Sequence, residues 1–307
     1  MVDAPRPEWL AVDWGTSRLR VWAMAGDHVL EARASDQGMG GLGRDGFEPA
    51  LLALTEGWLP ATGQIPVIAC GMVGARTGWA EADYRAIPCT PLDPAAAARP
   101  AVRDPRLSVL ILPGLSQAEP PDVMRGEETQ IAGFLARHPD HDGTLCLPGT
   151  HSKWVRLAGG KVTSFRTFMT GELYALLSRQ SVLRLSIGEA EPDAAAFATA
   201  AAHPGAMVEH LFPLRAASLL NGATPEVTAG RLSGLLIGAE VAAARDFWHD
   251  RRVTLIGAPG ISALYAQALA THRAAATQMD GAELVLDGLR AARRALSTDA
   301  TGKDAMR

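Results

Sequence analysis

The chain has 307 residues and a mass of 32.3 kDa, a length that suits two domains or one large domain. Hydrophobic residues make up 48% of it, which excludes a wholly disordered chain. Its 29 basic and 33 acidic residues give a formal net charge of −4, so no basic field points to a nucleic-acid partner.

Membrane and secreted classes are also disfavoured. No run reaches about 18 apolar residues, so we expect no transmembrane helix and no membrane partner. The first ten residues lack the pattern of a secretory signal. Cys70, Cys89 and Cys146 are widely spaced and form no CxxC motif, which favours reduced thiols and a cytoplasmic location.

The first predicted elements form a hairpin. Residues 10–13 read as an apolar strand, Gly15 and Thr16 as a turn, and residues 19–23 as an alternating strand. A turn at Gly26 then leads into a third strand over residues 28–34. Beyond it the pattern predicts a helix within 47–58, strands over 66–70 and 107–112, and a helix that carries Ile131, Phe134 and Leu135.

The hairpin plan then recurs. A strand leads into a Gly149-Thr150 turn, a second strand runs to residue 157, and a turn at Gly160 leads into a third strand over 162–168. Both turns lie 134 residues after their first copies, since 149 − 15 = 134 and 160 − 26 = 134. Two matched turns at one offset favour a duplicated domain over chance.

The remaining chain alternates helices with one further strand. We expect helices over 170–178 and 232–244, an Ala-rich helical region between them, and a strand over 252–256. A small-residue loop over 257–260 and another helix follow. The fold class is therefore α/β, with a hairpin opening each half.

Several catalytic motifs are excluded or disfavoured. Gly38–Gly43 fits GxGxxG, but it follows a third strand and no acid closes the next strand, which argues against a dinucleotide site. We expect this loop to approach a ligand closely, with Gly40 as a substrate contact. The chain has no P-loop, no GxSxG and no HExxH motif.

The two Gly-Thr turns are the stronger candidates. Backbone N–H groups in such turns can cradle phosphate oxygens, and hydroxyls add donors. Asp13 stands just before the first turn, where it could hold Mg²⁺. The alternative is two ordinary hairpins whose polar residues face water. The candidate phosphate contacts are Gly15, Thr16, Ser17 and Arg18 in the first turn, and Gly149, Thr150, His151, Ser152 and Lys153 in the second.

Four segments together give a family resemblance: Val12–Ser17, Met124–Gln130, Leu147–Trp154 and Met169–Leu173. In combination they resemble the 2-dehydro-3-deoxygalactonokinase family over residues 9–294. The resemblance implies an actin-like sugar kinase with two duplicated ribonuclease-H-like domains, residues 1–138 and 139–307, and a nucleotide cleft between them. It further implies ATP and Mg²⁺ as cofactors and phosphorylation of the 6-hydroxyl of 2-dehydro-3-deoxy-D-galactonate in galactonate catabolism.

The resemblance also implies site roles. The turns at Gly15 and Gly149 correspond to two phosphate loops. Pro148 stands where many relatives carry an acid, which leaves Asp13 as the main magnesium candidate. The loop with Gly257, Pro259 and Gly260 resembles an adenosine-binding loop. The alternative is an ordinary turn between a strand and a helix that binds no ligand.

A kinase of an alcohol needs a base beside the acceptor hydroxyl. Glu127 or Glu128 fits that role, and the alternative is two acids favoured by a helix N-terminus. Arg76 is the leading candidate for the substrate carboxylate, with Trp79 beside it in a sugar pocket; the alternative is an exposed loop arginine.

Two other functions compete with this interpretation. One is an actin-like kinase for another sugar or sugar acid, which would use the same phosphate contacts. The other is a nucleotide-binding regulator that does not transfer phosphate, which would need no base. The sequence leaves a homodimer open as a partner.

Overall fold

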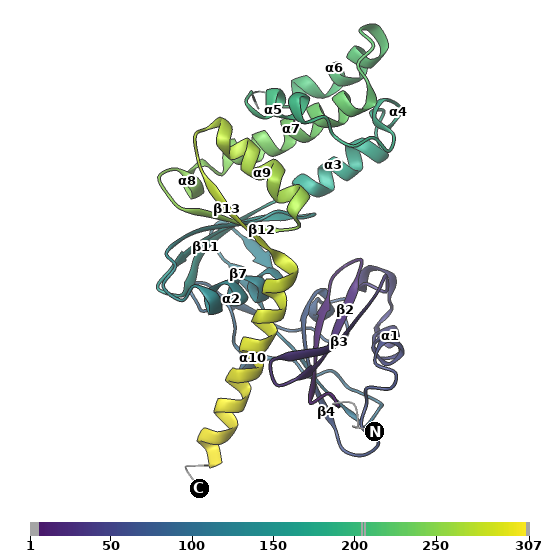
Figure 1. The fold of residues 1–307 in the computed structure, drawn as a ribbon, viewed down its shortest axis with the longest axis vertical. Coiled ribbons are helices and arrows are strands. Elements are labelled where there is room, and N and C mark those ends of the chain that lie inside the picture. The colour runs from purple at the N-terminus through teal and green to yellow at the C-terminus, as the bar shows by residue number, and fades with distance from the viewer. Residues whose placement is uncertain (1–5, 204, 206, 305–307) are drawn as a thin grey trace. The chain divides into compact units, whose positions relative to one another are not determined.

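The computed structural model describes residues 6–203, 205 and 207–304, and they form an α/β protein of two compact units (Figure 1). Unit 1 comprises the residues up to His141, Gly159–Val162 and the residues from Ala282 onward. Unit 2 comprises Asp142–Ala158 and Thr163–Gly281. The C-terminal helix thus belongs with the first unit, whereas the sequence boundary at 138/139 assigns it to the second half.

Unit 1 is built on a five-stranded sheet in the order β3-β2-β1-β4-β6. Strand β1 pairs antiparallel with β2 and parallel with β4, and β4 pairs parallel with β6. The strands are β1 (Trp9–Trp14), β2 (Leu19–Ala25), β3 (His28–Ser35), β4 (Ile65–Gly71) and β6 (Leu107–Ile111).

Unit 2 repeats this plan in its sheet, with the order β11-β10-β9-β12-β13. Strand β9 again pairs antiparallel with the following hairpin strand and parallel with β12. The identical order confirms the duplicated α/β fold that the 134-residue offset predicts. The strands are β9 (Gly143–Leu147), β10 (Ser152–Ala158), β11 (Lys161–Phe168), β12 (Val253–Gly257) and β13 (Ala276–Asp280).

A small sheet in unit 1 precedes the helix that begins with the candidate base residues Glu127 and Glu128. It has the order β5-β7-β8, with β5 (Tyr84–Ala86), β7 (Gly114–Gln117) and β8 (Asp122–Met124). Helix α2 (Glu127–Arg137) starts two residues after β8. A short antiparallel pair therefore holds the segment that precedes Glu127.

Both faces of the main sheet of unit 1 are covered. Helix α1 (Phe47–Leu54) packs on one face, where the rings of Trp14 and Phe47 lie 5.1 Å apart. Helix α10 (Gly281–Asp304) covers the other face through Val285 and Leu289. Burial on both faces explains why β1 and β4 read as continuous apolar runs. The short 3-10 turns of this unit are η1 (Met39–Gly41), η2 (Arg44–Gly46), η3 (Met72–Gly74) and η4 (Pro94–Ala96).

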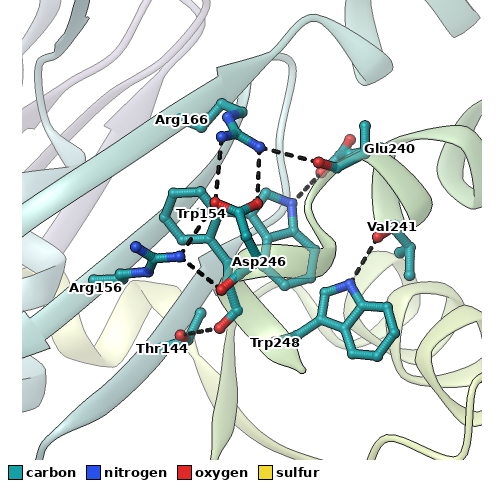
Figure 2. Close-up of polar contacts among 10 residues, drawn as sticks. Thr144, Trp154, Arg156, Arg166, Glu240, Val241, Asp246 and Trp248 are labelled. Carbon is teal, nitrogen blue, oxygen red and sulfur yellow. Dashed lines mark hydrogen bonds and ion pairs between the residues drawn. The ribbon is translucent and has the colours of Figure 1, made fainter. Parts of the chain in front are cut away.

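Seven helices of unit 2 lie after its hairpin among the described residues. They are α3 (Thr170–Arg179), α4 (Arg184–Ile187), α5 (Ala194–Ala201), α6 (Met207–Leu220), α7 (Pro225–Ala243), α8 (Arg245–Trp248) and α9 (Pro259–Thr271). Figure 2 shows how α7 and α8 attach to the hairpin strands: Arg156 and Arg166 both pair with Asp246, and Trp154 donates to Glu240. No described helix is long and apolar enough to cross a membrane.

Candidate active site

The first turn joins β1 to β2 in a tight loop. The N–H of Gly15 donates to the carbonyl of Arg18 at 2.9 Å. Thr16, Ser17 and Arg18 are exposed, and Arg18 lies 3.5 Å from the equally exposed Asp36. The turn therefore presents two hydroxyls and a guanidinium to solvent, where an anion can reach them.

The glycine-rich loop packs on this turn. Met39 N–H donates to Gly15 O at 3.0 Å, and Gly40 N–H donates to Thr16 O at 2.8 Å. A Cβ on Gly38 would overlap the backbone of the turn, which explains the glycine there. The close approach predicted for this loop is thus to the protein's own first turn, at Gly15 and Thr16. Because the Gly40 N–H already donates to Thr16 O, we do not include Gly40 among the proposed substrate contacts.

Asp13 has a partner that the sequence did not reveal. Arg20 lies opposite it in the β1–β2 register, and both its Nε, at 3.0 Å, and its Nη2 donate to Asp13 Oδ2. The other carboxylate oxygen, Oδ1, lies 3.9 Å from the thiol of Cys70. No cluster of three or more metal-binding side chains occurs in the described part of the chain. A Mg²⁺ carried by nucleotide phosphates needs only one or two carboxylates and keeps its waters, so Asp13 fits it.

Two glycines bring the start of α2 close to Asp13. A Cβ on Gly126 would lie 3.3 Å from the Cα of Gly71, and one on Gly71 would lie 2.7 Å from the carbonyl of Trp14 and 3.5 Å from Asp13 Oδ1. Both glycines have positive φ, 94° at Gly71 and 108° at Gly126, a conformation that other residues rarely adopt. The structure thus places the two predicted groups, Asp13 and the Glu127–Glu128 pair, in one region of unit 1.

The two glutamates differ sharply in environment. Glu128 is fully buried; its Oε2 accepts from Gly126 N–H at 2.6 Å and its Oε1 from the Thr129 hydroxyl at 3.2 Å. Burial, followed by the charge of Glu127, raises the pKa of Glu128 to about 8. Glu127 is only half-buried, and its Oε2 accepts from Arg125 N–H at 3.1 Å. At neutral pH Glu128 is therefore a protonated internal group, while Glu127 is the accessible one.

Cys70 joins this buried cluster. Burial raises the pKa of its thiol well above the ordinary value, and the charges of Asp13 and Glu128 raise it further. Cys70 therefore stays protonated and can donate weakly toward Asp13. Cys70, Cys89 and Cys146 are all free thiols, as predicted.

The predicted sugar pocket needs a correction. Arg76 is exposed, and its carbonyl accepts from Arg44. Trp79 is 7% exposed and stacks on Phe47 with 6.3 Å between ring centroids, so that ring face is covered by the core. A remaining part of Trp79 borders a cavity of about 440 Å³. The glycines around Trp79 predicted a sugar-binding pocket. In the structure they instead allow the backbone to pack closely, since a Cβ on Gly78 would overlap Val73 O.

The second turn is supported by the start of α3. Glu172 N–H donates to Thr150 O at 3.0 Å, and the Glu172 carboxylate lies 2.5 Å from His151 Nε2. A Cβ on Gly171 would overlap the carbonyl of Gly149. Gly149, Thr150 and His151 are exposed. This turn, like the first, offers donors to an anion while a neighbouring segment fixes its shape.

Ser152 and Lys153 lie inside the protein, contrary to their predicted role in phosphate binding. The Ser152 hydroxyl donates to Glu240 Oε2 at 2.8 Å, and Lys153 is 4% exposed. The cause is that β10 begins at Ser152 and its first four residues are all buried, as in a strand covered on both faces.

Glu240 on α7 is a buried acid that the sequence alone does not single out. It is 3% exposed and accepts from Ser152, from the indole of Trp154 and from the hydroxyl of Tyr265, each within 2.8 Å. Burial raises its pKa, and the hydrogen bonds partly offset that effect. Glu240 thus connects the strand after the second turn to α9. The available signal was a single acid in the apolar run of residues 235–242.

The predicted adenosine loop lies next to the second turn. Strands β9 and β12 are parallel neighbours, so their carboxyl ends meet at one edge of the sheet. A Cβ on Gly257 would lie 3.4 Å from the carbonyl of Pro148. Gly260 also borders a cavity of about 540 Å³, a size that suits a nucleoside. The other lining residues come from α3, the 187–192 segment and α9.

Comparisons with known proteins identify the family of the chain. The family model described as 2-keto-3-deoxy-galactonokinase matches residues 13–292. A probable 2-dehydro-3-deoxygalactonokinase of Rhizobium meliloti (strain 1021) is 40% identical over 302 residues, 94% of this chain and 97% of the relative. The 2-dehydro-3-deoxygalactonokinase of Escherichia coli (strain K12) is 36% identical and covers 94% of this chain and 98% of its own.

Two solved structures are similar to the chain, one of them bearing the same kinase name. A Sinorhizobium meliloti crystal structure that bears the same kinase name has a TM-score of 0.85 at 39% identity, covering 94% of this chain and 99% of its own. An activator of 2-hydroxyisocaproyl-CoA dehydratase from Clostridium difficile, solved with bound ADPNP, has a TM-score of 0.55 at 11% identity, covering 95% and 97%. The second likeness shows the actin-like ATPase fold alone.

Proposed function

The chain belongs to the 2-keto-3-deoxy-galactonokinase family, and on that premise we propose that it transfers the γ-phosphoryl group of ATP to the 6-hydroxyl of 2-dehydro-3-deoxy-D-galactonate. The observation that carries the proposal is the family match over residues 13–292. The reaction belongs to galactonate catabolism, and its use of ATP supports a cytoplasmic location.

Glu127 is the base in this proposal. It lies in the first turn of α2 and is half-buried, so an acceptor hydroxyl can reach its carboxylate. Its carboxylate accepts the proton of the 6-hydroxyl while that oxygen forms a bond to the γ-phosphorus, and the bond from that phosphorus to the bridging oxygen of ADP breaks. Glu128 is fully buried, so it supports the turn from behind without contacting the substrate.

The nucleotide contacts come from three loops. In unit 1 the exposed turn Gly15–Arg18 offers backbone N–H groups and hydroxyls to phosphate oxygens, and in unit 2 the exposed turn Gly149–His151 offers the same kinds of group. The loop at Gly257–Gly260 and the adjoining cavity take the adenosine. Asp13 is the residue that would hold Mg²⁺, which would supply positive charge to neutralise the phosphates.

The test is ADP release by the wild-type chain in a coupled assay. Mg·ATP is offered with 2-dehydro-3-deoxygalactonate, its gluconate epimer and plain hexoses. We expect turnover confined to the keto-deoxy acids. Turnover on hexoses alone would favour an actin-like kinase of another sugar, and ATP binding without turnover on any acceptor would favour a nucleotide-binding regulator.

Two partner proposals accompany this function. We propose that the enzyme needs no nucleic acid, since its net charge is −4. A homodimer stays a prediction, and light scattering of the purified chain measures it.

A further inference from the structure

Arg125 carries a buried positive charge that the protein does not fully satisfy. The residue is 8% exposed and directly precedes Gly126. Its Nη2 donates to Ala82 O at 2.7 Å, but Nε and Nη1 have no hydrogen-bond partner within the described chain. A guanidinium has five N–H donors and remains charged, so leaving it buried and unpaired is unfavourable. The arrangement indicates an anion that is supplied from outside the protein.

The groups around this guanidinium pack closely against it. The guanidinium lies over the ring of Tyr84, with 4.2 Å from Cζ to the ring centroid, and Tyr84 is 42% exposed. On another side stands Gly74, where a Cβ would lie only 2.9 Å from Nη1. A larger residue at position 74 would therefore press against one of the unpartnered nitrogens. Ring stacking holds the guanidinium plane without using its N–H groups.

Arg125 is also next to the proposed base. Its backbone N–H donates to Glu127 Oε2, and its positive charge lowers the pKa of Glu128 against the larger effect of burial. A ligand held by this guanidinium would therefore lie beside the turn that carries Glu127. An anionic substrate with a hydroxyl at its other end has the chemistry for both groups.

We propose that Arg125 binds the carboxylate of the sugar-acid substrate and makes the enzyme reject neutral sugars, an inference that rests on the proposed kinase function. A carboxylate matches the planar guanidinium through charge-assisted hydrogen bonds. A neutral sugar would leave the buried cation unpaired, and sites of this kind reject such analogues strongly. Arg125 replaces Arg76 in this role, because Arg76 is exposed and solvent screens its charge.

The arginines around the 440 Å³ cavity are weaker candidates. Arg44, Arg99 and Arg103 share that cavity with three acids: Asp45, Glu48 and Glu81. Arg103 already pairs with Asp45. The charges in that cavity are balanced, so it has no comparable need for an external anion.

The experiment compares the keto-deoxy acid with its carboxamide, which keeps the shape and removes the charge. Wild-type turnover of the acid is measured first, and its absence would count against the kinase function itself. Then kcat and KM for both acceptors are measured for wild type, Arg125→Met and Arg125→Lys, together with the Kd for ATP. Arg99→Met, an exposed arginine of the same unit, is the matched control.

We expect wild type and Arg99→Met to prefer the acid over the amide by at least about 100-fold in kcat/KM. In Arg125→Met that preference should fall to within about tenfold, through a higher KM for the acid, while the Kd for ATP stays the same. Arg125→Lys should retain an intermediate preference for the acid over the amide. If the Met variant does not fold, the Lys variant provides the test. An unchanged preference in folded Arg125 variants, or its loss in Arg99→Met, would overturn the proposal.

Discussion

The consecutive glutamates at the start of α2 differ in burial, and burial raises the pKa of Glu128. Glu128 is enclosed and has a pKa of about 8, whereas Glu127 is half-buried and interacts with the backbone of Arg125. Sequence alone left open which of the two acts as the base. The difference in burial assigns that role to Glu127 in our proposal.

Substitution of each glutamate separates the two roles. Glu127→Gln should lower kcat by about 10²- to 10⁴-fold with ATP binding retained, since the amide cannot accept the hydroxyl proton. Glu128→Gln should lower kcat by less than about tenfold, since an amide replaces an acid that is already uncharged. Steady-state kinetics and ATP titration measure both. The reverse order of effects would contradict the assignment.

Glu128 also predicts a pH dependence of stability. Folding raises its pKa from 4.5 to about 8, so between these values the folded state holds a proton that the unfolded state lacks. Its contribution to stability is full below pH 4.5 and is lost as pH rises through about 8. Compared with Glu128→Gln, the wild-type Tm should therefore fall between pH 5 and 8.5. Parallel Tm curves for the two proteins would refute this.

Several residue roles could not be predicted because burial is not visible in a single sequence. A tryptophan beside glycines suits a pocket wall and a core equally well, and Trp79 lies mostly in the core. Ser152 looks like part of a phosphate turn until the strand is known to begin there. The contacts of Arg125 and Arg20 could not be predicted either. Arg125 donates to Ala82, which is distant in the sequence, and Arg20 donates to Asp13 on the neighbouring strand.

At the scale of elements, a glycine contact joins α2 to α10. A Cβ on Gly133 would overlap the carbonyl of Leu284, and one on Gly288 would overlap the carbonyl of Thr129. Arg137 reinforces the contact by pairing with Glu283 and Asp287. Helical periodicity predicts which face of α2 is apolar, but it does not reveal that this face meets the C-terminal helix. This contact supports the helix that carries the proposed base.

Gly288→Ala tests that contact. Helix propensity alone would stabilise the variant by about 1 kcal/mol, whereas a rigid backbone overlap destabilises by about 1–3 kcal/mol. The overlap here is with backbone, so we expect a net loss in the free energy of unfolding, measured by denaturant titration. Gly43→Ala, where a Cβ meets nothing within 4 Å, should stay within about 0.5 kcal/mol of wild type. A stabilised Gly288→Ala protein would contradict the close contact.

At the scale of the whole molecule, the duplicated plan was accessible from sequence. The offset of 134 residues between glycine turns predicted two matching sheets, and the two strand orders agree. Gly26 and Gly160 have positive φ, at 55° and 70°, so a matching backbone conformation underlies one of the two repeated glycine pairs. The position of α10 in unit 1 was not accessible, because chain order suggests that a C-terminal helix belongs to the second half.

The central claim is phosphoryl transfer to the terminal hydroxyl of a keto-deoxy sugar acid. It is tested most directly by incubating the chain with Mg·ATP and 2-dehydro-3-deoxy-D-galactonate and locating the phosphate by mass spectrometry and phosphorus–proton correlation NMR. We predict one phosphate ester per sugar acid, with phosphorus coupled to the C6 protons and one ADP formed for each ester. An ester at another carbon, or ATP binding with no ester formed, would contradict the claim.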